Sequence, residues 1–234
     1  MKSSARQTKN AISGRQPAAS RLGELIDFGG KIAQAGFAAG TGGRISLREG
    51  NLVWIKPEGF AMGDLTPHAL CGVDLDTGKQ VQGKNRAPPE MRMHLAIYRA
   101  RPDVSAVFQA RSPWATVAID SGLELKAMFA EFINDLGRTG TMPFVIPGAR
   151  AFADAAGAFA RTHDTIFMVK RGVLAVGVTM KQAYYRLVVA EDAAKSLLAA
   201  VIVGKPKFFT QAQIAEILSL DAVQHRTKMV ENKS

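Results

Sequence analysis

One carboxylate and one imidazole in this 234-residue chain have the types and the spacing for proton or metal chemistry. Glu90 follows Pro88 and Pro89, and this sequence predicts the start of a helix, because proline is tolerated in a first helical turn and a carboxylate there meets the positive end of the helix dipole. His94 comes one helical turn later, so both side chains share a face. Such a pair can move a proton or contribute to a new metal site. The histidine can equally be a packing residue or support a site from behind, and these alternatives stay open.

A second candidate pair, Gln109 and Arg111, interrupts the stretch VSAVFQARSPWATVAI over 104–119. The apolar residues VSAVFQA predict a strand, which Pro113 ends. Arginine is permanently protonated and has no lone pair for a metal. Its guanidinium binds carboxylate and phosphate through paired N–H donors. This spot therefore favours an anion over a divalent cation.

Other polar segments of the sequence do not indicate a functional site. The run GFAAGTGGR over 36–44 lacks the Lys-Ser/Thr of a P-loop and the preceding strand of a Rossmann turn, so we do not interpret it as a nucleotide loop. The remaining histidines, His68, His163 and His225, are expected at the surface.

The elements that must position these residues alternate irregularly along the chain. Strands are predicted in pairs within 44–59, 71–83 and 165–179, and singly at 104–110. Helices are predicted from Ser20, from Pro88, over 113–121, around 125–132, over 149–162, after Thr179 and over 211–220, with capping boxes at Thr179/Gln182 and Thr210/Gln213. Strand pairs and helices interleave without a regular βαβα rhythm, which predicts an α/β fold of three α/β/α layers with a mixed, mainly antiparallel central sheet flanked by helices.

The amino-acid composition limits the domain organisation, location and partners that this chain can have. The hydrophobic content of 47% suits one main domain over 20–204, preceded by a basic disordered arm over 1–19 and followed by a C-terminal helix and tail over 205–234. We expect no membrane span and no secretory signal, and the single Cys71 fits a reducing compartment, so a cytoplasmic location is expected. The net charge of +10 lies partly in the termini. This distribution, without any Lys/Arg run that has interleaved aromatics, argues against a nucleic-acid partner, and the excess of positive charge suits a small anionic substrate.

Several segments together resemble the class II aldolase/adducin family. They occur in the family's order between about 20 and 204, and they read GTGGRISLR (40–48), IKPEG (55–59), PPEMRMHLAIYRARPDVSAVFQARSPWAT (88–116), PFVIPG (143–148) and VKRGVLAVGVTMKQAYYRLVVAEDAAKSLLAA (169–200). The resemblance implies an aldolase, epimerase, dehydratase or decarboxylase of small phosphorylated or carboxylated hydroxy compounds. It also implies a zinc-type metal held by three histidines, a glutamate as acid/base, and a homotetramer with the pocket at a subunit interface.

Carried over residue by residue, the resemblance implies loss of the metal site and retention of the glutamate. The three histidine positions are occupied by Gln109, Arg111 and Arg171. In the phosphate-binding segments, the family's asparagine corresponds to Arg44, its Ser/Thr before a glycine to Glu58, and its two serines to Pro88 and Pro89. The residues that match are Thr41, Gly43, Gly59 and the acid/base Glu90.

Two classes of function follow from this pattern. The first is a metal-independent enzyme or binder for a small anionic metabolite, with no cofactor, in which Glu90 moves a proton and Arg44, Arg111 and Arg171 hold the anion. The second is a non-catalytic, adducin-like interaction protein whose retired site is filled by ion pairs, Arg44 with Glu58 and Arg111 with Glu90. Arginines converging on an empty cavity would favour the first, and closed pairs the second. In either case we expect Arg111 and Glu90 within salt-bridge reach.

Overall fold

A computed structural model describes residues 19–232, so most of the predicted basic arm lies outside the described residues. The core is one eight-stranded sheet with the strand order β4-β3-β2-β1-β5-β8-β7-β6. The strands are β1 Arg44–Glu49, β2 Leu52–Ile55, β3 Cys71–Asp74, β4 Gln80–Gln82, β5 Ala106–Ala110, β6 Thr139–Met142, β7 Thr165–Met168 and β8 Gly172–Gly177. Every neighbouring pair is antiparallel except β6 and β7. The predicted mixed, mainly antiparallel sheet is confirmed.

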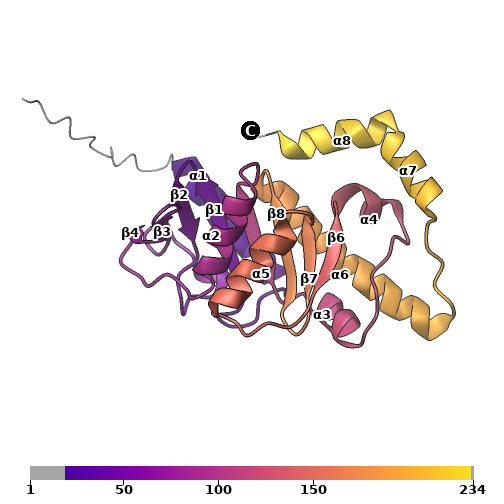
Figure 1. Ribbon diagram of the computed structural model, residues 1–234, viewed down its shortest axis with the longest axis horizontal. Helices are drawn as coiled ribbons and strands as arrows, with labels where there is room; N and C mark the ends of the chain where they lie inside the picture. The colour runs from indigo at the N-terminus through magenta and orange to yellow at the C-terminus, as the bar shows by residue number, and fades with distance from the viewer. Residues whose placement is uncertain (1–18, 233–234) are drawn as a thin grey trace, which may run out of the picture.

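Helices cover both faces of the sheet and make the three layers (Figure 1). One face packs α1 Ala19–Gln34, α3 Pro113–Asp120, α4 Ala130–Asp135 and α6 Met180–Val203 around a buried cluster that includes Phe28, Phe108 and Leu187. The other face packs α2 Met91–Ala100 and α5 Arg150–Ala160 around Ile97, Val107 and Phe152. Side chains of a strand point alternately to the two faces. Phe108 and Val107 are accordingly divided between the two clusters.

The C-terminal segment returns to the domain as two helices, α7 Gln211–Ser219 and α8 Asp221–Glu231 (Figure 1). The helical conformation is interrupted between them at Leu220, which has an extended backbone. The single predicted helix over 211–220 therefore corresponds only to α7. The predicted Thr210/Gln213 capping box is present. α8 is held against the start of α6, where Thr179 Oγ1 donates to Val230 O at 2.9 Å and Gln182 Nε2 donates to Glu231 Oε1 at 3.1 Å.

Three local predictions need correction. The helix expected around 125–132 begins only at Ala130, because Leu125 and Ala127 are buried in the core and Ala127 O accepts a hydrogen bond from Phe209 N. Strand β6 was missed, since the parallel partner that stabilises it is distant in sequence. At α6, Thr179 caps Gln182 N as predicted, but the Gln182 side chain accepts from Val178 N, so the reciprocal bond of a capping box is not formed.

Of the described helices, none is long and apolar enough to cross a membrane.

Candidate functional site

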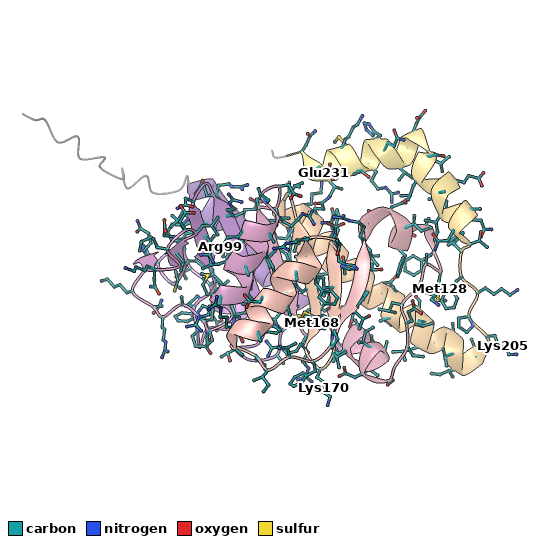
Figure 2. The ribbon with its side chains drawn as sticks, viewed as in Figure 1. Arg99, Met128, Met168, Lys170, Lys205 and Glu231 are labelled. Atoms are coloured by element: carbon teal, nitrogen blue, oxygen red, sulfur yellow. The ribbon has the colours of Figure 1, made fainter. Side chains whose placement is uncertain are left out.

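Most of the predicted site residues, but not Arg111, meet at one end of the sheet, where β1 begins, β5 ends and β8 begins. Arg44 pairs across the sheet with Gln109, and Gln109 with Leu174, so the register brings these strand ends together. Lys170, in the turn before β8, marks this end at the lower edge of Figure 2. α2 also starts here, and Glu90 is its N-cap residue. The two prolines therefore precede the helix rather than form its first turn.

Glu90 lies between two guanidinium groups. Arg44 Nε contacts Glu90 Oε2 at 3.1 Å, and Arg171 Nη2 lies 3.6 Å from Glu90 Oε1. Arg44 also pairs through Nη2 with Glu58 Oε2 at 3.0 Å. Arg44 and Glu90 are largely buried while the Glu58 carboxylate is 44% exposed. The predicted pair of Arg44 with Glu58 is thus present, and Arg44 bridges it to Glu90.

Arg44 also fixes the glycine-rich loop before β1. Its Nη1 donates to Thr41 O at 3.1 Å and to Gly43 O at 2.8 Å. Gly43 has a left-handed φ of 71°, and an added Cβ would lie 2.9 Å from Met62 Cε and 3.2 Å from Gln109 O. Glycine is therefore required at 43, and Thr41 and Gly43 contribute their backbone carbonyls to Arg44. Gly59, also left-handed with a φ of 80°, follows Glu58 in the turn after β2.

A buried lysine that the sequence analysis did not single out joins the two loops. Lys56 is fully buried, and its Nζ donates to Thr41 O and Phe60 O. Burial, and next the charge of Arg44, lower the pKa of Lys56 to about 8. The signal in the sequence was a lysine directly after the apolar strand LVWI, but only the folded chain shows that its amine stays inside.

His94 lies behind Glu90 on α2, buried between this helix and β1. It is fully buried, its Nδ1 lies 2.6 Å from Ser46 Oγ, and Ser46 Oγ lies 2.8 Å from the Tyr98 hydroxyl. Burial, and next the charge of Arg44, lower the pKa of His94 to about 3, so the imidazole is neutral at physiological pH. Its Nε2 has no partner among the described residues. With Nδ1 engaged by Ser46 and Glu90 engaged by two arginines, the supporting role fits better than a Glu90/His94 metal site.

Two side chains at the predicted histidine positions carry unsatisfied polar atoms. Gln109 is 7% exposed and its Oε1 has no partner among the described residues, and the same holds for Arg171 Nε. The Arg171 guanidinium lies 5.1 Å above the Phe152 ring. Burial lowers the pKa of Arg171, and Glu90 opposes this effect. An unpaired buried polar atom costs about 1–3 kcal/mol. A ligand that paired with these atoms would recover part of that free energy.

The predicted contact between Arg111 and Glu90 is wrong. Arg111 is exposed and forms no ion pair or side-chain hydrogen bond with any described residue, while Arg44 and Arg171 occupy the two Glu90 oxygens. Arg111 lies beyond the end of β5, which ends at Ala110, and Arg171 approaches Glu90 instead from the turn before β8. Two of the three arginines are therefore in closed pairs, and the third is free.

The side chains at the three histidine positions do not suit a zinc-type metal. Zinc is bound by imidazole, thiolate or carboxylate, and here the positions hold an amide and two guanidinium groups, of which only the amide has an acceptor atom. Throughout the part of the chain that the structure describes, no three His, Cys, Asp or Glu side chains gather in a way that could hold a metal ion.

Comparison with known proteins identifies the architecture. Residues 23–198 match the family described as Class II Aldolase and Adducin N-terminal domain. An L-fuculose phosphate aldolase of Methanococcus vannielii is 34% identical over 176 residues, which cover 74% of this chain and 93% of that protein. A 3-oxo-tetronate 4-phosphate decarboxylase of Escherichia coli K12 is 26% identical over 204 residues, covering 84% and 94% respectively. Among solved structures, an L-fuculose 1-phosphate aldolase superposes with a TM-score of 0.79 at 22% identity, over 86% of this chain and 95% of that one.

Proposed function

This chain belongs to the class II aldolase and adducin family, and we propose that it binds a small phosphorylated or carboxylated hydroxy or oxo metabolite beside Glu90. Relatives named as aldolases and as decarboxylases support this class of substrate. In this proposal the chain is a lyase-like enzyme or binder that does not use the family's metal, and Arg111 and Arg171 contact the anion. A cytoplasmic location is part of the same proposal.

The observation that carries the proposal is a free, exposed Arg111 just after β5 and a partly unsatisfied Arg171 just before β8, the strand that pairs with β5. Within the contacting cluster, Arg44, Arg171 and the buried Lys56 supply three positive charges against two negative charges from Glu58 and Glu90, which leaves 3 − 2 = +1. A phosphate or carboxylate would neutralise this excess and pair with the guanidinium N–H donors.

Glu90 and the arginines can support cleavage of a carbon–carbon bond in which the proton that Glu90 removes is returned to the product. Glu90 takes the proton of a hydroxyl group two carbons from a carbonyl, and the resulting alkoxide collapses to an aldehyde as the carbon–carbon bond breaks. The electron pair moves into the second fragment as an enolate. A guanidinium stabilises the enolate oxygen, and the protonated Glu90 then returns the proton to the enolate carbon.

Calorimetric titration with phosphoglycolate, which carries both a phosphate and a carboxylate, tests the site. We expect binding by the wild type, and a loss of about tenfold or more in affinity in Arg111→Ala and in Arg171→Ala. Arg161→Ala is the matched control, since Arg161 is exposed at the end of α5 and has no ion pair with a described residue. Elemental analysis of the same wild-type sample should find no stoichiometric zinc, iron or manganese. One tightly held metal per chain would refute the metal-independent part of the proposal.

A second candidate function is a non-catalytic, adducin-like interaction protein. The observation that favours it is the closed pairing of Arg44 with both Glu58 and Glu90, which is what a retired site filled by ion pairs would show. If phosphoglycolate, phosphate and small carboxylates all fail to bind the wild type, this candidate becomes the better one.

A homotetramer is part of the main proposal, with the pocket completed at a subunit interface. Large apolar side chains are exposed near the same end of the molecule, namely Trp114 at 47%, Val117 at 52%, Phe144 at 49% and Ile146 at 69%. Lys170, which marks the site, lies close to Phe144, with its Nζ 5.9 Å from that ring. Exposed apolar side chains next to a site support its burial by another subunit.

A further inference from the structure

A concave site lies away from the Glu90 cluster, between the β3–β4 hairpin and the outer sides of α2 and α5. It is a groove of about 890 Å³, and neither Arg44, Glu90 nor Arg171 lines it. Pro88 and Pro89, directly before Glu90, form part of its wall. Residues of α2 line the groove along most of the helix, up to Arg99, which Figure 2 labels at the left of the molecule, above Lys170.

The groove has a positively charged rim. Arg86, Arg92, Arg99 and Arg150 line it together with a single acid, Asp154, so the side chains carry a net charge of 4 − 1 = +3. Arg150 Nε is 3.8 Å from Asp154 Oδ2 at the surface, and Arg99 is engaged by the carbonyls of Leu75 and Asp76.

Two of these guanidinium groups are free. Arg86 and Arg92 are exposed, and their side chains form no ion pair or hydrogen bond with any described residue. Both therefore present all their N–H donors to a ligand, and guanidinium groups bind phosphate through pairs of such donors.

The floor of the groove is apolar. Val73, Leu95 and Ala153, from β3, α2 and α5, line it and are at most 6% exposed. A bare inorganic ion would leave this surface uncovered. The volume falls within the range of about 300–1,000 Å³ that is usual for small-molecule sites. An apolar floor under a cationic rim fits an anion that also carries a sizeable apolar or aromatic body.

The loop that carries Arg86 is held in place before any ligand arrives. Gln80 Nε2 donates to the carbonyls of Gln82, Gly83 and Asn85, and Gln80 Oε1 accepts from Ala87 N. Preorganisation of this kind lowers the cost of binding. The loop also contacts the first site, because Arg86 O accepts from Glu58 N at 3.0 Å, and Glu58 pairs with Arg44.

We propose that this groove is a second ligand site, for a phosphorylated small molecule of nucleotide size with an aromatic or apolar body. It goes beyond the proposed function, because its residues are distinct from those around Glu90. Arg86 and Arg92 bind the phosphate groups, and Val73, Leu95 and Ala153 contact the body of the ligand.

Calorimetric titration of the full chain with ADP, pyrophosphate and adenosine tests the proposal. ADP should bind, and both pyrophosphate and adenosine, which present only the charge or only the body, should bind about tenfold or more weaker. The double variant Arg86→Ala, Arg92→Ala should weaken ADP binding by about tenfold or more. Both positions are exposed, so we expect the variant to fold, and circular dichroism and its melting temperature check this.

Two matched variants separate this site from the first one. Arg161→Ala, which removes one exposed charge elsewhere, should leave ADP affinity within about twofold of the wild type. Arg171→Ala should also keep ADP binding while losing phosphoglycolate, so either site can fail independently of the other. The proposal is overturned if ADP does not bind at millimolar concentration, if the double variant binds it as tightly as the wild type, or if Arg171→Ala abolishes ADP binding.

Discussion

At the scale of single residues, Arg44 is the organising side chain of the candidate site. It contacts two carboxylates and two backbone carbonyls, from the loop before β1, the turn after β2 and the start of α2. Removing one partner of a buried ion pair is costly, because the remaining charge loses its compensation. The stability of the site therefore depends on this residue more than on Arg111.

We expect Arg44→Met to lower the free energy of unfolding by about 3 kcal/mol, since it leaves Glu90 with only the longer contact to Arg171. Arg111→Met is the matched control. It removes an exposed arginine without a described partner, so its effect should stay within about 0.5 kcal/mol. Urea denaturation of the three proteins measures both values, and similar losses in the two variants would contradict the assigned roles.

His94 gives the fold a defined dependence on pH. Its pKa in the folded state is about 3, against an ordinary value of 6.5, so protons bind preferentially to the unfolded chain in the interval between. Stability is therefore fully present above pH 6.5 and is lost as the pH falls below it, by up to about 1.4 kcal/mol per pH unit.

His94→Asn tests this dependence, since asparagine can still bond Ser46 but does not titrate in this range. Between pH 7 and pH 5 the wild type should lose about 2 kcal/mol more stability than the variant. Chemical denaturation at several pH values gives the two slopes. Equal slopes would show that the imidazole is not responsible.

At the scale of elements, β8 begins in close contact with the end of β5, between the two site arginines Arg111 and Arg171. Gly172 has a φ of 91°, and its missing Cβ leaves room for the backbone at Ala110 and Arg111. The turn before it carries Arg171 toward Glu90, while Arg111 leaves the sheet. Arg171 therefore pairs with the glutamate from the turn before β8, and Arg111, beyond the end of β5, does not.

Gly172→Ala should destabilise the protein by about 3 kcal/mol or more, because it adds a backbone clash to the strain of a left-handed conformation. Gly36→Ala separates the two effects. Gly36 has a φ of 75°, but nothing lies within 4 Å of an added Cβ, so only the conformational cost of about 1 kcal/mol is expected. Thermal unfolding of both variants provides the comparison. A Gly172→Ala variant no less stable than Gly36→Ala would contradict the close approach.

At the scale of the whole molecule, the two candidate ligand sites both adjoin α2 and differ in construction. The Glu90 cluster balances carboxylates against arginines in a largely buried setting, whereas the groove beside α2 leaves two arginines free over an apolar floor. The loop from Gln82 to Pro89 connects them, through the hydrogen bond from Glu58 N to Arg86 O.

Assembly is the prediction that belongs to this scale. Sedimentation velocity at micromolar concentration should show a tetramer, because exposed apolar side chains at the end of the molecule near the site favour association. Ile146→Lys, which places a charge at a 69% exposed apolar position, should shift the distribution toward smaller species. Lys205→Glu, a charge change at an exposed position after α6, is the control and should leave the assembly intact. A stable wild-type monomer would contradict the tetramer.

The sequence by itself determined the family and the layered α/β fold, as well as most of the elements. Alternating apolar residues, capping residues and the order of the motif segments act locally, so they are visible without the folded chain. The same local signals identified Glu90 at a helix start, whereas the Arg44–Glu58 pair was predicted through the family resemblance, as one of two alternatives.

Only the tertiary structure decided which charged groups meet. The sequence predicted that Arg111 would pair with Glu90, and in the folded chain Arg171 pairs with it instead. Lys56 and His94 owe their lowered pKa values to burial by segments distant in sequence. Strand β6 and the late start of α4 likewise depend on partners more than 20 residues away, because contacts between distant segments outweigh local propensity once the core forms.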